Sequence, residues 1–146
     1  MSEEKKSGYK IKDSGQRRSF GTGAVRDMAG EKGRFDLVPM ETLRALAIHF
    51  QKGCEKYGER NFEKGIPVHS LLDSAMRHLC MVIDGKDDEN HLVASIWNLF
   101  VAYQTILRIQ DGRLPAELYD LPKKITLPDP YQVNSKKKIA KLKRNI

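Results

Sequence analysis

Apolar side chains recur every three or four residues in the segment that begins at Pro39 and ends near Gly58. This spacing places them on one face of an α-helix, which completes a turn about every 3.6 residues. Proline suits the first position of a helix, where its missing N–H costs no hydrogen bond. The predicted apolar face of this helix consists of Leu43, Leu46, Ala47, Phe50, Cys54 and Tyr57.

Two further segments show the same periodicity, from about Val68 to Ile83 and from about Asp88 to Gln110. The expected core face of the first consists of Leu71, Leu72, Ala75, Leu79, Val82 and Ile83. That of the second consists of Leu92, Ile96, Leu99, Phe100, Tyr103, Ile106 and Leu107. No internal repeat and no alternating strand pattern stand out. The sequence therefore predicts an all-α fold, an antiparallel bundle of three to four helices.

The segments outside these helices are polar, rich in glycine or punctuated by proline. Residues 1–19 lack periodicity and are expected to form a flexible arm, and residues 20–38 an irregular loop. The helical domain is predicted to span residues 20–112. A proline-punctuated strap is predicted for residues 113–135, and a basic tail for residues 136–146.

The net charge of +7 belongs largely to this tail, which carries six positive charges and no acid. The rest of the chain has a net charge of about +1. The excess positive charge is therefore confined to the tail and is not a property of the predicted helical domain. Such a tail can bind nucleic acid or aid solubility, and the sequence leaves both open.

No apolar run is long enough to predict a membrane span, and the N-terminal residues lack the apolar stretch of a secretory signal. Cys54 and Cys80 both fall within predicted helices. Buried thiols in a reducing compartment are favoured over a disulfide. These observations predict a cytoplasmic protein with no membrane partner, in the host cytoplasm if a phage encodes it.

Polar side chains, several of them titratable, gather beside the apolar faces of the second and third helices. The second helix carries Asp73, Arg77 and His78, and the third carries His91, Ser95 and Asn98. The turn between them is strongly acidic. Carboxylates suit Mg²⁺ or Mn²⁺, and imidazoles shift the preference toward Mn²⁺, Zn²⁺ or Fe²⁺. The predicted metal ligands are Asp73, His78, Asp88, Glu89 and His91.

Each of these features also has a structural explanation. Asp73 and Arg77 can form a surface ion pair, which contributes little stability. A single histidine beside an apolar face is usually a hydrogen-bonded core residue. An acidic turn at a helix start can simply interact with the helix dipole. Their clustering on two neighbouring helices is what favours a functional site.

The segment from Glu55 to Pro67 is either a solvated connector or a substrate-facing loop. Its cations suit phosphate oxygens, and its aromatic rings can stack on a base. Glu59 and Glu63 are expected to hold the loop in shape. The predicted substrate-binding residues are Lys56, Tyr57, Arg60, Asn61, Phe62, Arg77 and Asn98, with Arg26 and Arg34 from the upstream loop.

Four segments, "GAVRDMAGEKGRFDLVP", "KYGERNFEKGIP", "DSAMRHL" and "HLVASIWN", follow one another over about residues 20–108. Together they resemble the dATP/dGTP diphosphohydrolase N-terminal domains of phages and bacteria, which are grouped with the MazG-like nucleotide pyrophosphohydrolases. The general MazG pattern has ExxE on one helix and ExxD on the next. This chain has Asp73, Arg77 and His78 on the first of these helices, and His91 opens the second.

The resemblance implies a MazG-like helical bundle that forms homodimers or homotetramers. It also implies hydrolysis of a (deoxy)purine nucleoside triphosphate to monophosphate and pyrophosphate with Mg²⁺ or Mn²⁺, which would adjust the phage nucleotide pool. Asp73, His78 and His91 are then the candidate catalytic residues, and Asn61 and Asn98 would orient the substrate. The alternative is an inactive MazG-like bundle that binds a nucleotide, or nucleic acid through its tail.

Overall fold

The computed structural model describes residues 11, 13, 15–27 and 32–131. The chain divides after Arg34 into two units, and each is described by itself. The predicted tail, and residues 1–10 of the predicted arm, lie outside the described residues.

The first unit contains a small β-hairpin that the sequence did not predict. Strand β1 (Arg17–Ser19) pairs antiparallel with β2 (Val25–Asp27), so that Arg17 lies opposite Asp27 and Arg18 opposite Arg26. The turn between them is closed by two backbone hydrogen bonds: the Phe20 amide donates to the Ala24 carbonyl, and the Gly23 amide donates to the Phe20 carbonyl, each at 2.9 Å. The expectation that no strand forms is wrong here, since β1 falls within the predicted arm and β2 within the predicted irregular loop. Strands of three residues are too short to show an alternating pattern.

The second unit is helical, which confirms the predicted all-α fold. It contains α1 (Met40–Tyr57), α2 (Val68–Ile83) and α3 (His91–Gln110), with short 3₁₀ turns η1 (Phe35–Leu37), η2 (Asn61–Lys64) and η3 (Ala116–Leu118). Helix α3 begins three residues later than predicted, because Asn90 caps it by accepting a hydrogen bond from the Val93 amide at 3.1 Å.

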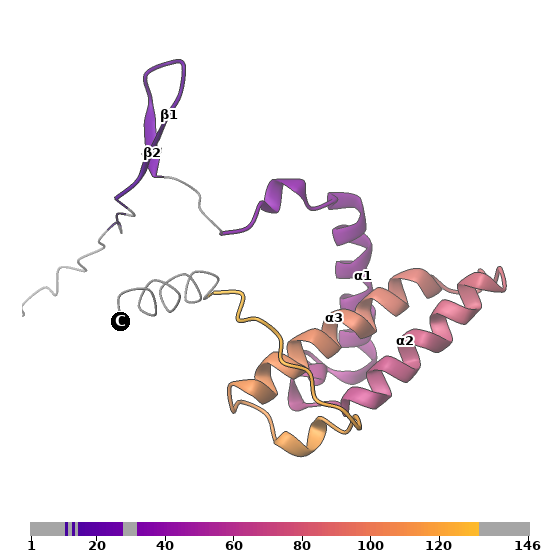
Figure 1. Ribbon diagram of the computed structural model, residues 1–146. Helices are drawn as coiled ribbons and strands as arrows, with labels where there is room; N and C mark the ends of the chain where they lie inside the picture. Colours follow the sequence, from indigo (N-terminus) through magenta and orange to yellow (C-terminus); the bar gives the residue numbers. More distant parts are fainter. Residues whose placement is uncertain (1–10, 12, 14, 28–31, 132–146) are drawn as a thin grey trace, which may run out of the picture. The chain divides into compact units, whose positions relative to one another are not determined.

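Helices α2 and α3 lie side by side and antiparallel, and α1 packs against α3 (Figure 1). The face that α3 buries consists mainly of small and polar residues: His91, Val93, Ala94, Ser95, Asn98, Val101, Ala102, Thr105 and Ile106. Its hydroxyls are satisfied internally, since Ser95 donates to the Ala75 carbonyl at 2.9 Å and Thr105 to the Val101 carbonyl at 2.8 Å. Small side chains allow the helices to approach closely, and this face of α3 is therefore the one that packs in the core.

The predicted apolar faces are consequently only partly buried, which corrects the sequence analysis. On α3, Leu92, Leu99, Phe100 and Tyr103 are exposed, although Ile106 is buried as expected. On α1, the exposed members are Leu43, Ala47, Cys54 and Tyr57. On α2, Leu71 and Ala75 are buried whereas Leu79 and Ile83 are exposed. Both cysteines are free but exposed, so the expectation of buried thiols is wrong.

Residues 113–131, the described part of the predicted strap, run back along the helical unit. Asp120 accepts a hydrogen bond from the His69 amide at 2.9 Å and also pairs with the His69 ring. Asp120 thereby caps α2, whose N-cap residue Pro67 offers no side-chain cap. These hydrogen bonds hold the pKa of Asp120 below its usual range. Gly65, at φ 106°, packs so closely on Leu118 that a Cβ there would clash.

Helix α3 is long and apolar enough to cross a membrane by length and composition alone, contrary to the premise of the sequence analysis. In the structure it packs lengthwise on α2 through the face that contains His91, Ser95 and Asn98. This packing buries the small and polar face of α3, and the large apolar side chains Leu92, Leu99 and Phe100 remain exposed.

Candidate functional site

Three side chains meet at the end of the helical pair where α2 turns into α3. His78 comes from α2, Glu89 from the turn, and His91 from the first position of α3. His78 Nδ1 lies 3.0 Å from His91 Nδ1, and Glu89 Oε1 lies 3.3 Å from the former and 3.1 Å from the latter. His91 is buried, His78 is half-buried and Glu89 is exposed. We call this group the histidine–glutamate cluster.

The three donor atoms form a triangle of the size that the ligands of one divalent cation span. Ligand atoms held about 2.1 Å from a metal at tetrahedral or octahedral angles are roughly 3.0–3.4 Å apart. Two imidazoles and one carboxylate suit Mn²⁺, Zn²⁺ or Fe²⁺ better than Mg²⁺. The residues present therefore fit a divalent cation.

Asp88 supports the cluster from outside it. Its Oδ1 lies 2.9 Å from His91 Nε2, on the far side of the ring from the cluster. When Nε2–H donates to Asp88, Nδ1 keeps its lone pair and can bind a cation. The same hydrogen bond lowers the pKa of Asp88, which keeps the carboxylate charged. Asp88 thus orients a ligand in this arrangement.

The structure does not bring Asp73 to the cluster. Its carboxylate pairs instead with Arg77 one turn further along α2, and both side chains are mostly exposed. Of the five predicted metal ligands, the cluster therefore unites His78, Glu89 and His91, and Asp88 contacts it. Asp73 and Arg77 thus form the surface ion pair that the sequence analysis gave as the structural explanation of these two residues.

A cavity of about 380 Å³ opens between α1, the loop after it, α2 and α3. This volume lies in the range of small-molecule sites, which are commonly apolar with a few polar groups. Its apolar wall includes Phe50, Phe62, Ile66, Leu71 and Trp97. Its polar lining includes Arg60, Asn61, Ser70, Ser74, Arg77 and Asn98.

The cavity and the cluster lie along the same helix faces. Ser74 lines the cavity and precedes His78 by one turn of α2, and Asn98 lines the cavity two turns after His91 on α3. At about 1.5 Å per residue these steps are roughly 6 and 10 Å. A nucleotide is long enough to place its base in such a cavity and its phosphates near such a cluster.

The family model described as dATP/dGTP diphosphohydrolase, N-terminal, matches residues 22–113. The chain belongs to this family. No curated protein and no solved structure matches the chain.

The match to the dATP/dGTP diphosphohydrolase N-terminal family includes the three helices, the histidine–glutamate cluster and the cavity. It ends at Arg113, before η3 and Asp120. The family's name is that of an enzyme, a diphosphohydrolase, and this supports an enzyme of that kind.

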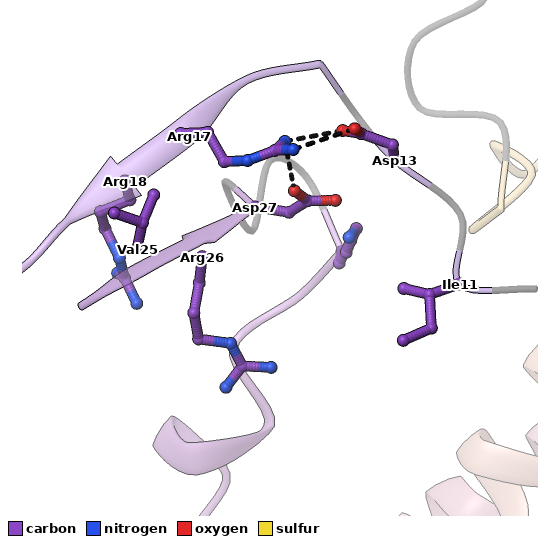
Figure 2. A pocket seen from close by; sticks show the side chains of 8 residues that line it. Ile11, Asp13, Arg17, Arg18, Val25, Arg26 and Asp27 are labelled. Atoms are coloured by element: carbon purple, nitrogen blue, oxygen red, sulfur yellow. Dashed lines mark hydrogen bonds and ion pairs between the residues drawn. The ribbon is translucent and has the colours of Figure 1, made fainter.

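Six of the predicted substrate-binding residues line the cavity of this family member: Tyr57, Arg60, Asn61, Phe62, Arg77 and Asn98. Lys56 does not, and its Nζ lies over the Tyr57 ring, 5.0 Å from the centroid. Arg26 and Arg34 belong to the first unit. Figure 2 shows Arg26 and Arg18 beside a separate hollow of that unit, where Arg17 pairs with Asp13 and Asp27.

Sequence reasoning missed two aromatic residues of this site, His49 and Trp97. Their rings lie 5.8 Å apart, centroid to centroid, and Trp97 also lines the cavity. Burial lowers the pKa of His49, while Glu89 and His78 are near enough to act on it by charge. His49 therefore packs beside Trp97 of the cavity wall. In the sequence, the position of the single tryptophan directly before Asn98 was the feature that could have indicated its place in the site.

The loop after α1 holds Arg60 in an unusual backbone conformation. Its φ of 55° and ψ of 24° are left-handed, and among the described residues it is the only non-glycine with a positive φ. Its guanidinium pairs with Glu63 at 2.9 Å, and Glu63 also meets Arg108 of α3 at 3.3 Å. Glu63 thus ties the loop to α3, as the sequence predicted for a shape-holding acid.

Proposed function

We propose that this chain is a metal-dependent pyrophosphohydrolase of deoxypurine nucleoside triphosphates, and that its activity adjusts the nucleotide pool. The observation that carries the proposal is the placement of a three-donor cluster one to two helical turns from an aromatic-walled cavity with two arginines. The reaction breaks the bond between the α- and β-phosphates, and water adds to give monophosphate and pyrophosphate.

His78, Glu89 and His91 would hold the cation, which when bound supplies charge neutralisation and activates a water molecule. Mn²⁺ suits this set best, and Mg²⁺ less well. Arg60 and Arg77 would bind phosphate oxygens, because a guanidinium makes paired hydrogen bonds to them. Phe62 and Tyr57 would pack against the base, and Asn61 and Asn98 would orient it.

Incubating the protein with each of the four dNTPs, with Mn²⁺ or Mg²⁺, tests the proposal. We expect dATP and dGTP to yield monophosphate and pyrophosphate in equal amounts, faster with Mn²⁺. Chromatography of the nucleotides together with a pyrophosphate assay measures both products. A folded protein that releases no pyrophosphate from any dNTP would overturn the proposal.

A nucleotide-binding bundle without turnover is the second candidate. The observation that favours it is the single carboxylate in the cluster, since Asp73 pairs with Arg77 and the two imidazoles can hydrogen-bond each other. Calorimetric binding of a dNTP without product formation would favour this candidate. Nucleic-acid binding through residues 136–146 would show as affinity for DNA or RNA that is lost when they are deleted.

We also propose that two copies of the chain associate through the exposed apolar side chains of the helices. These include Leu43 and Ile48 on α1, Met76, Leu79 and Ile83 on α2, and Leu92, Leu99, Phe100 and Tyr103 on α3. Monomeric proteins rarely expose large contiguous apolar patches, and all three helices of this chain carry exposed large apolar side chains. In a two-fold symmetric dimer, the second copy covers this apolar surface with the same surface of its own.

Light scattering after size exclusion is expected to give the mass of a dimer or tetramer for the wild type. Leu99→Lys should shift it toward the 16.7 kDa monomer, because a buried lysine would lack a partner. Ile125→Lys, in the strap, is the matched control and should leave the mass unchanged. A monomeric wild type at micromolar concentration would contradict this proposal.

A further inference from the structure

The first unit has a hollow whose described lining is mostly charged. The hollow has a volume of about 690 Å³ and lies beside strands β1 and β2 (Figure 2). Cationic side chains outnumber carboxylates in its lining, which consists of Ile11, Asp13, Arg17, Arg18, Val25, Arg26, Asp27 and Lys32. The ion pairs among these residues decide which of the charges are available to a ligand.

Both carboxylates of the lining are bound by a single arginine. The Arg17 guanidinium donates to Asp13 at 2.6 and 2.9 Å and to Asp27 at 2.7 Å. Figure 2 shows Arg17 turned toward these carboxylates, whereas Arg18 and Arg26 point away from them. Within the described part of the chain, neither Arg18 nor Arg26 forms an ion pair. Their two guanidinium groups are therefore available to an anion.

Arg18 and Arg26 face each other across the hairpin. They are opposite residues in the register of β1 and β2, so their side chains leave the same face of the ribbon from Cβ atoms about 5 Å apart. Like charges in this position repel each other, and a two-stranded hairpin has little stability of its own. A bound anion replaces this repulsion by attraction to both groups. The pairing therefore indicates an anion site rather than a structural role.

The guanidinium of Arg18 is also held in place. Its Cζ lies 4.7 Å from the centre of the ring of Phe20, which directly follows β1. Stacking on a ring covers one face of the planar guanidinium and leaves the N–H groups at its edge free to donate. Arg18 is thus oriented before a ligand arrives, which lowers the entropic cost of binding.

We propose that the hairpin binds the phosphates of a nucleotide through Arg18 and Arg26, with Lys32 as a third cation of the hollow. A guanidinium makes paired hydrogen bonds to phosphate oxygens, and two facing ones can clamp one phosphate group. Phosphates suit several cations better than a carboxylate does, because a nucleotide chain carries more negative charge. These phosphates belong either to a free nucleoside triphosphate or to a nucleic-acid strand. The site goes beyond the proposed function, since it shares no residue with the histidine–glutamate cluster or the cavity.

The test measures the binding of two probes to the full-length protein: dGTP without a divalent cation, by calorimetry, and a labelled single-stranded oligodeoxynucleotide, by fluorescence anisotropy. In Arg18→Ala/Arg26→Ala we expect Kd to rise roughly 10- to 100-fold, the loss of charge-assisted hydrogen bonds. The hairpin should survive, because the double substitution removes a repulsion. Lys123→Ala/Lys124→Ala is the matched control, since it removes two exposed cations from the strap. Its Kd values should stay near those of the wild type.

The two probes distinguish the sources of the phosphate. A loss confined to dGTP identifies a free nucleotide as the ligand, a loss confined to the oligonucleotide identifies a strand, and a loss with both shows that the site accepts either. For a strand, the slope of log Kd against log salt concentration should fall by about 1.4, because each contact to a single strand contributes about 0.7. Unchanged Kd values for both probes, or equal losses in the two double variants, would overturn the assignment. Because no turnover is measured, a failure of the proposed hydrolysis would leave this result unaffected.

Discussion

Replacing Glu89 with glutamine is expected to lower pyrophosphate release by about 100-fold or more and to weaken Mn²⁺ binding. The carboxylate provides the one negative ligand of the histidine–glutamate cluster, 3.1–3.3 Å from both imidazole nitrogens. Substituting a residue that merely supports a metal ligand typically costs 10–100-fold, so losing a direct ligand should cost at least as much. Glutamine has nearly the same shape, and Glu89 is exposed, so the fold should survive.

Asp87→Asn is the matched control for this experiment. It removes one charge from the same acidic turn, but Asp87 is not part of the cluster. Activity and Mn²⁺ affinity, the latter followed by calorimetry, should stay near the wild-type values in this variant. Equal losses in the two variants would mean that the turn acts through its overall charge and that the cluster holds no cation.

The helix bounds were readable from the sequence because each helix has a clear 3.6-residue pattern and a recognisable start. Helix α2 was predicted with the bounds that it has, and α3 was misplaced by only the first turn. Which face of each helix is buried was harder to predict from the sequence. On α3, large apolar residues such as Leu99 and Phe100 were predicted to form the core, yet smaller and more polar residues such as Ser95 are the buried ones.

The candidate site, too, could be predicted only in part from the sequence. His78 and His91 were predicted to be neighbours because a short turn joins their helices, and they lie within hydrogen-bonding distance. Asp73 was grouped with them only because it shares a helix, and the structure pairs it with Arg77. Trp97 was missed because its place in the cavity wall becomes visible only once α1, α3 and the loop are placed.

Replacing Arg60 with glycine is expected to weaken nucleotide binding while sparing the stability of the fold. Arg60 holds a left-handed backbone conformation, which costs a non-glycine residue roughly 1–2 kcal/mol and a glycine almost nothing. Its ion pair with Glu63 is mostly exposed on the arginine side and contributes little. Strain that is kept at a cavity-lining residue indicates a role in binding rather than in folding.

We expect KM for dGTP to rise roughly 10- to 100-fold in Arg60→Gly, the loss of one charge-assisted hydrogen-bond contact. Its Tm should equal or exceed that of Arg60→Ala, which loses the same guanidinium but keeps the left-handed strain. Lys64→Ala removes a cation of the same loop that does not line the cavity, and should leave KM unchanged. If Arg60→Gly binds dGTP as tightly as the wild type, the loop serves only as scaffold, and the strain at Arg60 has no part in recognition.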